Sequence, residues 1–315
     1  MSAFWHVITA ESFKLVRKRR TYVLAFLWWL LLPSLALIIG RVLVSNLGAF
    51  LADAGTAIDP LIQNLASPFG IARVALVGPA FTSPPFYTIA VAALAATLIG
   101  EERSHHMWKS VLTTQPSRTA VLAGKVAVAM LFLGALMGGA LVSGILFGAF
   151  GTLFLPTTFE GDWGGLANLF LLQWSFSAAL VAFALLMMHV ARNLAVGVIL
   201  VFFLPALLEG LYTVYATVVG FQPINRFNVF LQTIRMRQVL EDLPAYFFGA
   251  NVFAPGRAPM RELVAEITGG ATSGPDLGTL IGTGITIERA AWVVAGYTAL
   301  LLALLAWRFL RADVD

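Results

Sequence analysis

Long apolar runs are the feature that most constrains the fold of this chain. Residues 22–44 and 119–155 are two of them, and each is long enough for a helix of the about 20 residues that cross a bilayer. Only 11% of the residues are charged, whereas a typical soluble domain has about 25%. We therefore expect an all-α integral membrane protein.

Six apolar runs are predicted to cross the membrane, at about 22–44, 81–100, 119–155, 168–190, 194–219 and 287–307. They form one transmembrane domain over residues 1–315, with both termini on one side. Twelve of the 20 Lys and Arg residues lie on that side, which the positive-inside rule places in the cytoplasm. Residues 45–80 are then an outer loop, and the 221–287 interval is a longer outer loop with helices before the last span.

The N-terminal residues 2–20 predict a helix on the membrane surface. Its apolar positions recur near one face: Phe4, Trp5, Ile8 and Leu15. Its charged positions fall off that face: Glu11, Lys14, Arg17 and Lys18. A basic amphipathic helix that contains Trp is typical of a segment lying among lipid headgroups. The alternative is a charged flank that only orients the first span, but the apolar positions recur too regularly for that.

The stretch from Ile99 to Val126 is the most polar passage between two predicted spans. It opens with Glu101, Glu102 and Arg103. A short helix is predicted next, with polar His105, His106 and Lys109 and apolar Met107, Trp108, Val111 and Leu112. Pro116 ends this helix, Ser117 can cap the next one, and Lys125 lies at the entrance of the third span. We expect the short helix to make contacts with a soluble partner and to do no chemistry.

The two adjacent histidines favour such contacts over a metal site. Neighbouring residues on a helix point about 100° apart, so His105 and His106 make a poor chelate without other ligands. The chain also has no cysteine and no G-x-x-x-x-G-K-[ST], H-E-x-x-H or G-x-S-x-G motif. No catalytic, cofactor-binding or metal site is therefore expected. Most cations lie at the ends of apolar runs, which argues against binding to nucleic acid despite a pI near 9.6.

Arg41 and Glu209 are charged residues at a similar predicted depth in the outer part of the bilayer. Arg41 lies roughly 31 Å along a helix from Arg20, and Glu209 roughly 25 Å from Arg192. An intramembrane carboxylate is a functional candidate by default. We interpret the two as a structural ion pair, and exposure of Glu209 to an outer vestibule is the alternative.

Two pairs of glycines at four-residue spacing occur in the third predicted span, at positions 134 and 138 and at positions 144 and 148. Such spacing lets two membrane helices approach closely. The sequence does not identify the helix that packs there.

The polar stretch resembles the cytoplasmic loop of type-2 permeases of ATP-binding-cassette exporters. The matching elements are Glu101-Glu102-Arg103, the short helix, Pro116-Ser117-Arg118 and Leu122-Ala-Gly-Lys125. The basic N-terminal helix and the ending Trp307-Arg-Phe-Leu-Arg-Ala-Asp313 resemble other parts of the same family, so the likeness covers the six-span layout.

The resemblance implies a half-transporter in the plasma membrane of a prokaryotic cell. A pair of ATPase subunits would bind ATP and Mg, dock on the short helix and drive alternating access. A second permease chain, identical or not, would complete the pathway. Two alternatives remain at this point: an integral-membrane enzyme acting on lipid or peptide, and an ion-coupled secondary transporter. The cargo is not evident from the sequence.

Overall fold

The computed structural model describes residues 2–42, 44–45, 58–80, 85–104, 117–191, 193–220, 242–257, 259 and 285–311. These parts are helical and contain no strand, which confirms the predicted fold class. Five helices among them are long and apolar enough to span a membrane. They are Arg19–Val42, Arg118–Gly151, Trp163–Val190, Leu194–Tyr212 and Ile287–Arg311.

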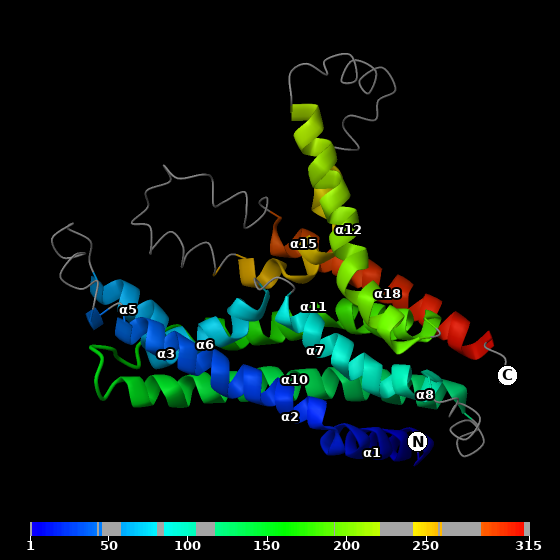
Figure 1. Ribbon diagram of the computed structural model, residues 1–315, viewed down its shortest axis with the longest axis horizontal. Coiled ribbons are helices and arrows are strands. Elements are labelled where there is room, and N and C mark those ends of the chain that lie inside the picture. Colours follow the sequence, from blue (N-terminus) through cyan, green and yellow to red (C-terminus); the bar gives the residue numbers. More distant parts are fainter. Residues whose placement is uncertain are drawn as a thin grey trace.

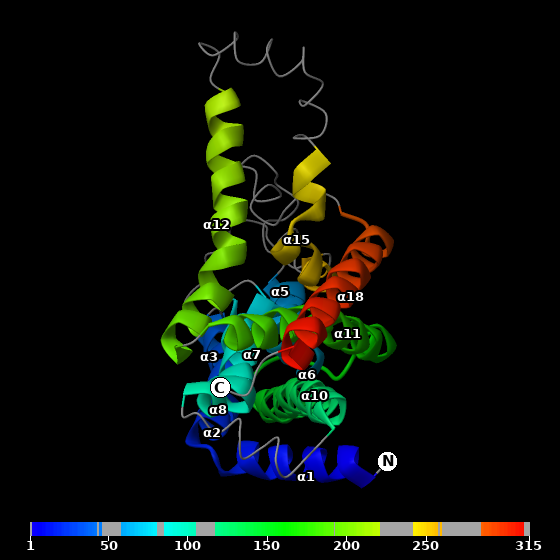
Figure 2. The same ribbon diagram turned by 90° about the vertical axis from the view of Figure 1, so that its right-hand side faces the viewer.

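The N-terminal helix α1 (Ser2–Arg17) is separated from the first span by one extended residue, Lys18. That span consists of α2 (Arg19–Phe26), the π-helical turn η1 (Leu27–Leu31) and α3 (Leu32–Val42). Helix α1 crosses the end of helix α10 (Arg118–Gly151), which is best seen in Figure 2. The break at Lys18 therefore lets the chain change direction between the surface helix and the first span.

Three tryptophans join neighbouring helices inside the bundle. The Nε1–H of Trp28 donates to the carbonyl of Ala75 at 2.9 Å, and Trp29 donates to Leu136 at 2.7 Å. Trp174 donates to Met130 at 2.9 Å. A membrane interior offers no water to these N–H groups, so a carbonyl from another helix satisfies them.

The interval 45–80, expected as a loop, contains two helices in its described part. Ser67 separates α5 (Ile58–Ala66) from α6 (Pro68–Val77), and its hydroxyl caps α6 by accepting from the Gly70 amide at 2.9 Å. Pro68 at the first position of α6 suits a helix start. A short 3-10 turn, η3 (Gly78–Ala80), follows. The expectation of a loop was wrong because the buried face of these helices consists of small residues such as Ala72 and Ala75. Their burial depends on packing against other helices, and small residues give no strong hydrophobic pattern in the sequence.

Helix α6 is the partner of the glycine face on α10. A Cβ on Gly144 would lie 2.7 Å from the Cα of Ala72, and one on Gly148 would overlap the Cα of Pro68. Both neighbours are backbone atoms, so no side-chain rearrangement would make room. The predicted packing role of these two glycines is confirmed, and Figure 1 shows α6 beside α10.

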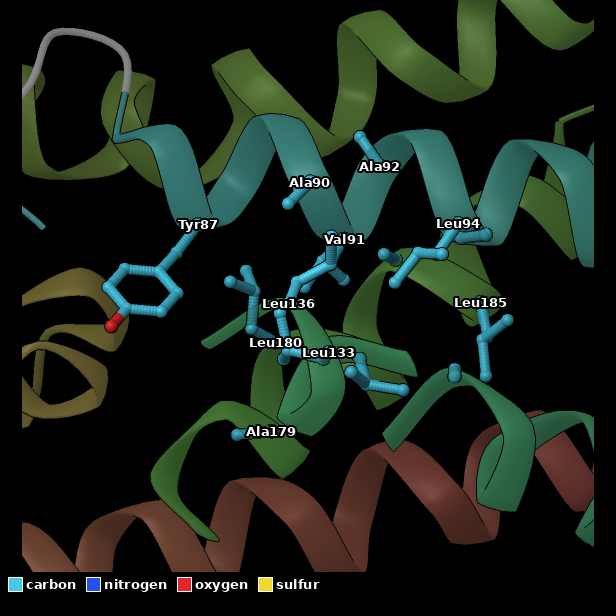
Figure 3. Close-up of a cluster of buried hydrophobic side chains, with 14 of the residues drawn as sticks. Tyr87, Ala90, Val91, Ala92, Leu94, Leu133, Leu136, Ala179, Leu180 and Leu185 are labelled. Carbon is cyan, nitrogen blue, oxygen red and sulfur yellow. The ribbon is translucent and has the colours of Figure 1, made fainter. Parts of the chain in front are cut away.

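The second apolar segment forms the centre of the bundle. It runs through α7 (Phe86–Ala95), the π-helical turn η4 (Ala96–Gly100) and α8 (Glu101–Ser104). Its apolar part, Phe86–Gly100, is shorter than the five long helices. Figure 3 shows Val91 and Leu94 facing Leu133 and Leu180 of the flanking helices.

The remaining long helices are α11 (Trp163–Val190), α12 (Leu194–Gly220) and α18 (Ile287–Arg311). Helix α12 contains Pro205, and its C-terminal part projects away from the bundle in Figures 1 and 2. Both chain ends and α8 lie at the same end of the molecule. Arg118 of α10 connects that helix to α18 there, because its guanidinium donates to the carbonyl of Leu310 at 2.9 Å.

Residues 242–257 fold back onto the bundle beside α11, α12 and α18. They include a 3-10 turn, η6 (Leu243–Tyr246), and α15 (Phe248–Val252). Gln173 of α11 donates to the carbonyl of Val252 at 3.3 Å, and Tyr297 of α18 donates to Tyr246 at 2.9 Å. We call residues 242–257 the outer segment, after the outer loop that the sequence predicts for them. Most of the remaining 221–287 interval lies outside the described residues.

Candidate functional site

A cluster of charged side chains lies where α1, α8 and α10 meet. Along α1, Val7, Glu11 and Leu15 are four residues apart and therefore share one face. That face packs on α10, and all three side chains are buried. Gly124 permits the close approach, because a Cβ there would lie 2.5 Å from a methyl group of Val7. The packing carries the Glu11 carboxylate into the protein.

Lys125 is the centre of the cluster and is completely buried. Its ammonium group donates to Glu11, to both carboxylate oxygens of Glu102 at 2.9 Å, and to the carbonyl of Leu98 at 2.6 Å. Ser117 caps the start of α10 by accepting a hydrogen bond from the Ala120 amide. Lys125 therefore lies two turns into that helix. A buried ammonium group needs such a complete set of acceptors, since water does not reach it.

Three further cations from the α1–α2 region extend the cluster toward solvent. Lys14 donates to Glu102 at 2.8 Å and lies 3.6 Å from Glu11. Lys18 contacts Glu101 at 2.6 Å, and Arg20 contacts the same carboxylate at 3.2 Å. Together, the buried Glu11, Glu102 and Lys125 and the half-buried Lys14 carry no net formal charge.

The arrangement links three segments that the sequence separates by many residues. Glu102 lies at the end of the central helix and Lys125 near the start of α10, so they bracket residues 105–116. Glu11 attaches α1 to the same point. Charge-assisted hydrogen bonds therefore hold together the two helix ends from which residues 105–116 continue. We call these residues, Glu11, Lys14, Glu101, Glu102 and Lys125, the charge cluster.

The structure brings together four of the residues singled out from the sequence: Lys14, Lys18, Glu101 and Glu102. Arg103 lies in α8, and its side chain is outside the described residues. The rest of the predicted docking helix is outside them as well: His105, His106, Met107, Trp108, Lys109, Val111 and Leu112. Their proposed role stays a prediction.

Sequence reasoning assigned Glu11 to the wrong side, off the apolar face of α1, and placed Lys125 only at the entrance of a span. One signal was available, because Glu11 continues the Val7–Leu15 spacing and so falls on an apolar face. An acid on such a face predicts a buried cation on a neighbouring helix.

The two faces of α1 also differ from the expectation. Leu15 is buried and Ile8 is partly buried against the bundle, and Phe4 is half-buried. Trp5 is 59% exposed and therefore lies on a different side of the helix. Phe13 and Val16 join Trp5 on the exposed side, and Arg17 stacks on the Phe13 ring at 4.0 Å. Helix α1 thus has one apolar face against the protein and a second one that the described residues leave open.

Arg41 and Glu209 have separate partners in the structure. Arg41 donates to the carbonyl of Phe154 at 3.5 Å, and its guanidinium lies 6.0 Å from that ring. Glu209 accepts the amide of Gly249 at 2.8 Å and interacts with the charge of Arg257. The proposed pair assumed that equal depth implies proximity. However, α3 packs on α5, α6 and α10, whereas α12 packs on α7, α11 and α15.

Comparisons with known proteins give one family match. A family model described as ABC-2 family transporter protein matches residues 7–207. The matched region contains the whole charge cluster and ends within α12. No curated protein and no solved structure matches the chain.

Proposed function

The chain belongs to the ABC-2 transporter family, and on that premise we propose that it is the membrane-spanning permease subunit of an ATP-binding-cassette exporter. Energy comes from separate ATPase subunits, which bind ATP and Mg on the cytoplasmic side. They dock on residues 105–116 and switch the permease between inward-facing and outward-facing states. The chain contains no phosphate-binding G-x-x-x-x-G-K-[ST] motif of its own, which supports a separate source of energy.

The observation that carries this proposal is the buried ion pair of Glu102 and Lys125, which lie on either side of the proposed docking residues 105–116. A conformational switch needs a rigid element whose contacts differ between the two states. Helix α8 ends two residues after Glu102, and α10 begins seven residues before Lys125. A push on residues 105–116 therefore acts on the central helix and α10 together.

Orientation in the cell membrane is part of the proposal. The cation count places the termini in the cytoplasm, and α8 lies at the same end of the molecule as both termini. Lys18 and Arg20 also lie at that end, where they contact Glu101.

A second permease chain completes the proposed transporter. The projecting helix α12 exposes large apolar side chains along its length, including Ile199, Phe203, Leu207 and Leu211. The rest of its own chain covers little of this helix. Such a helix needs neighbours from lipid or another chain, and a paired permease supplies the latter.

Co-purification with an ATPase subunit tests the central claim. The full chain should retain an ATPase encoded beside it, and deletion of Met107–Thr113 should abolish both retention and any stimulation of ATP hydrolysis. Deleting a loop of the outer side, residues 157–161, is the matched control and should leave retention intact. Retention without Met107–Thr113 would contradict the docking role.

The two alternatives give different results in the same preparation. An integral-membrane enzyme would convert a lipid or peptide without any ATPase. An ion-coupled transporter would move cargo in vesicles that contain only the permease and an ion gradient. Either result would replace the exporter proposal.

A further inference from the structure

A cavity of about 270 Å³ lies between the middle of α12 and the outer segment. Val201, Pro205 and Glu209 line it from one face of α12, because they are four residues apart. Pro205 has no N–H to close the helix ladder at that point. The other walls are mainly apolar and come from α7, α11 and the outer segment.

Glu209 is the acidic group of this cavity, and the outer segment supplies its partners. The Gly249 amide donates to its carboxylate at 2.8 Å. Arg257, at the other end of the segment, lines the same cavity and contributes a positive charge that acts on Glu209. Both interactions depend on the segment being seated on the bundle.

Displacement of the outer segment changes the surroundings of Glu209. The carboxylate belongs to α12 and stays in the wall, whereas Gly249 and Arg257 leave with the segment. An ionised carboxylate in an apolar wall is energetically unfavourable unless another donor or cation takes the place of Gly249 and Arg257. A cationic group on a ligand replaces the positive charge that leaves with Arg257.

We propose that this cavity is a cargo site for amphipathic cations, and that Arg257 is a tethered substitute for the cationic group of the cargo at Glu209. The cargo's apolar part lies against Val201, Phe202 and Phe253, and its ammonium or guanidinium group binds Glu209. Cargo and seated segment then compete for one carboxylate. Binding of the cargo therefore favours release of the outer segment. By linkage, removal of the Arg257 charge raises the affinity of the cavity for the cargo. The inference rests on the proposed exporter function, since it names the class of cargo.

The test uses the absence of native cysteine in the chain. Leu243, which is 39% exposed in the outer segment, is replaced by Cys and labelled with an environment-sensitive fluorophore. The full-length permease in lipid nanodiscs is titrated with decyltrimethylammonium or with decyl sulfate, which carry equal alkyl chains and opposite charges. No ATPase or nucleotide is present, so failure of the docking proposal does not affect the result.

Decyltrimethylammonium should give a saturable signal, and decyl sulfate should not. Glu209→Gln, which keeps a hydrogen-bond acceptor for Gly249, should weaken the cation's affinity by about fivefold or more. Arg257→Gln should strengthen it by about fivefold or more, because the competing charge is gone. Opposite shifts from the two variants are the signature of competition.

Two variants that remove charges elsewhere on the outer side serve as controls. Glu160→Gln and Arg41→Gln should leave the affinity for decyltrimethylammonium unchanged. The probe partitions equally into the nanodisc lipid around these variants and around the parent protein. The proposal is overturned if Glu209→Gln leaves the cation's affinity unchanged. It is also overturned if Arg257→Gln weakens binding, or if decyl sulfate binds with the same dependence on these residues.

Discussion

The ammonium group of Lys125 lies 2.9 Å from each carboxylate oxygen of Glu102 and has no exposed surface. The two residues belong to different helices and are 23 positions apart in the chain. Their contact closes the base of the proposed docking loop. Its energetic consequences can be measured without any knowledge of the cargo.

Replacement of Lys125 by Met should destabilise the permease strongly. The side chain keeps its approximate size, but Glu11 and Glu102 then lose their buried cation, which typically costs about 3–5 kcal/mol. Chemical denaturation in mixed micelles measures the loss. The triple variant Lys125→Met, Glu11→Gln, Glu102→Gln should regain much of it, because no uncompensated buried charge remains. A triple variant as unstable as the single one would assign the effect to packing.

Glu101→Gln should have a much smaller effect than Glu102→Gln. Glu101 pairs with Lys18 and Arg20, whose side chains are 41% and 52% exposed, so water and salt screen the interaction. Exposed pairs contribute about 0–1 kcal/mol. The difference between Glu101→Gln and the parent should also vanish when the salt concentration is raised. A loss for Glu101→Gln that equals the loss for Glu102→Gln would show that both carboxylates belong to the buried part.

The spans were predictable because they depend on local hydrophobic length. The predicted boundaries of 119–155 and 287–307 compare with Arg118–Gly151 and Ile287–Arg311 in the structure. Helices α5 and α6 were not predictable in the same way. Their buried face consists of small residues such as Ala72, whose burial depends on the glycines of a distant helix.

The candidate site was half predictable for a similar reason. Glu101 and Glu102 are conspicuous as an acidic pair beside a span. The role of Glu11 depends on which face of α1 packs against the bundle. Gly124 sets that face, because its lack of a side chain leaves room for Val7. Trp5 was assigned to the wrong side for the same reason. Depth along a helix likewise gave no information on lateral position, which is why Arg41 and Glu209 have different partners.

Gly148→Ala should destabilise the permease, although alanine is the better helix former. The new methyl group would overlap the backbone of Pro68 in α6, so the two helices must move apart. Overpacking of this kind costs about 1–3 kcal/mol. Gly138→Ala is the matched control, because nothing lies within 4 Å of its Cβ position. It should be neutral or stabilising by up to about 1 kcal/mol. Denaturation curves that show equal effects for both variants would contradict the proposed α6–α10 contact.

The exposed side of α1 should lie against lipid. Val16 is 48% exposed, and it shares that side with Trp5, which is 59% exposed. Ala10 is also exposed, but it lies about 120° around the helix from Val16 at 100° per residue. Aromatic residues such as Trp5 favour the headgroup level, and the neighbouring cations Arg17 and Arg19 favour an anionic surface. A helix with this layout places Val16 toward the acyl chains and Ala10 toward water.

Fluorophores on single cysteines report this orientation in a chain without native cysteine. A bimane label at Val16→Cys should be quenched by lipids brominated near the headgroup, and one at Ala10→Cys should be quenched mainly by iodide in the water. Because the opposite face of α1 holds Glu11 against Lys125, a helix fixed in this way connects the headgroup layer to the charge cluster. Equal quenching at the two positions by lipid would show α1 wrapped by protein or lipid on all sides. Equal quenching by iodide would show it standing in water, and in both cases the surface-helix assignment would be lost.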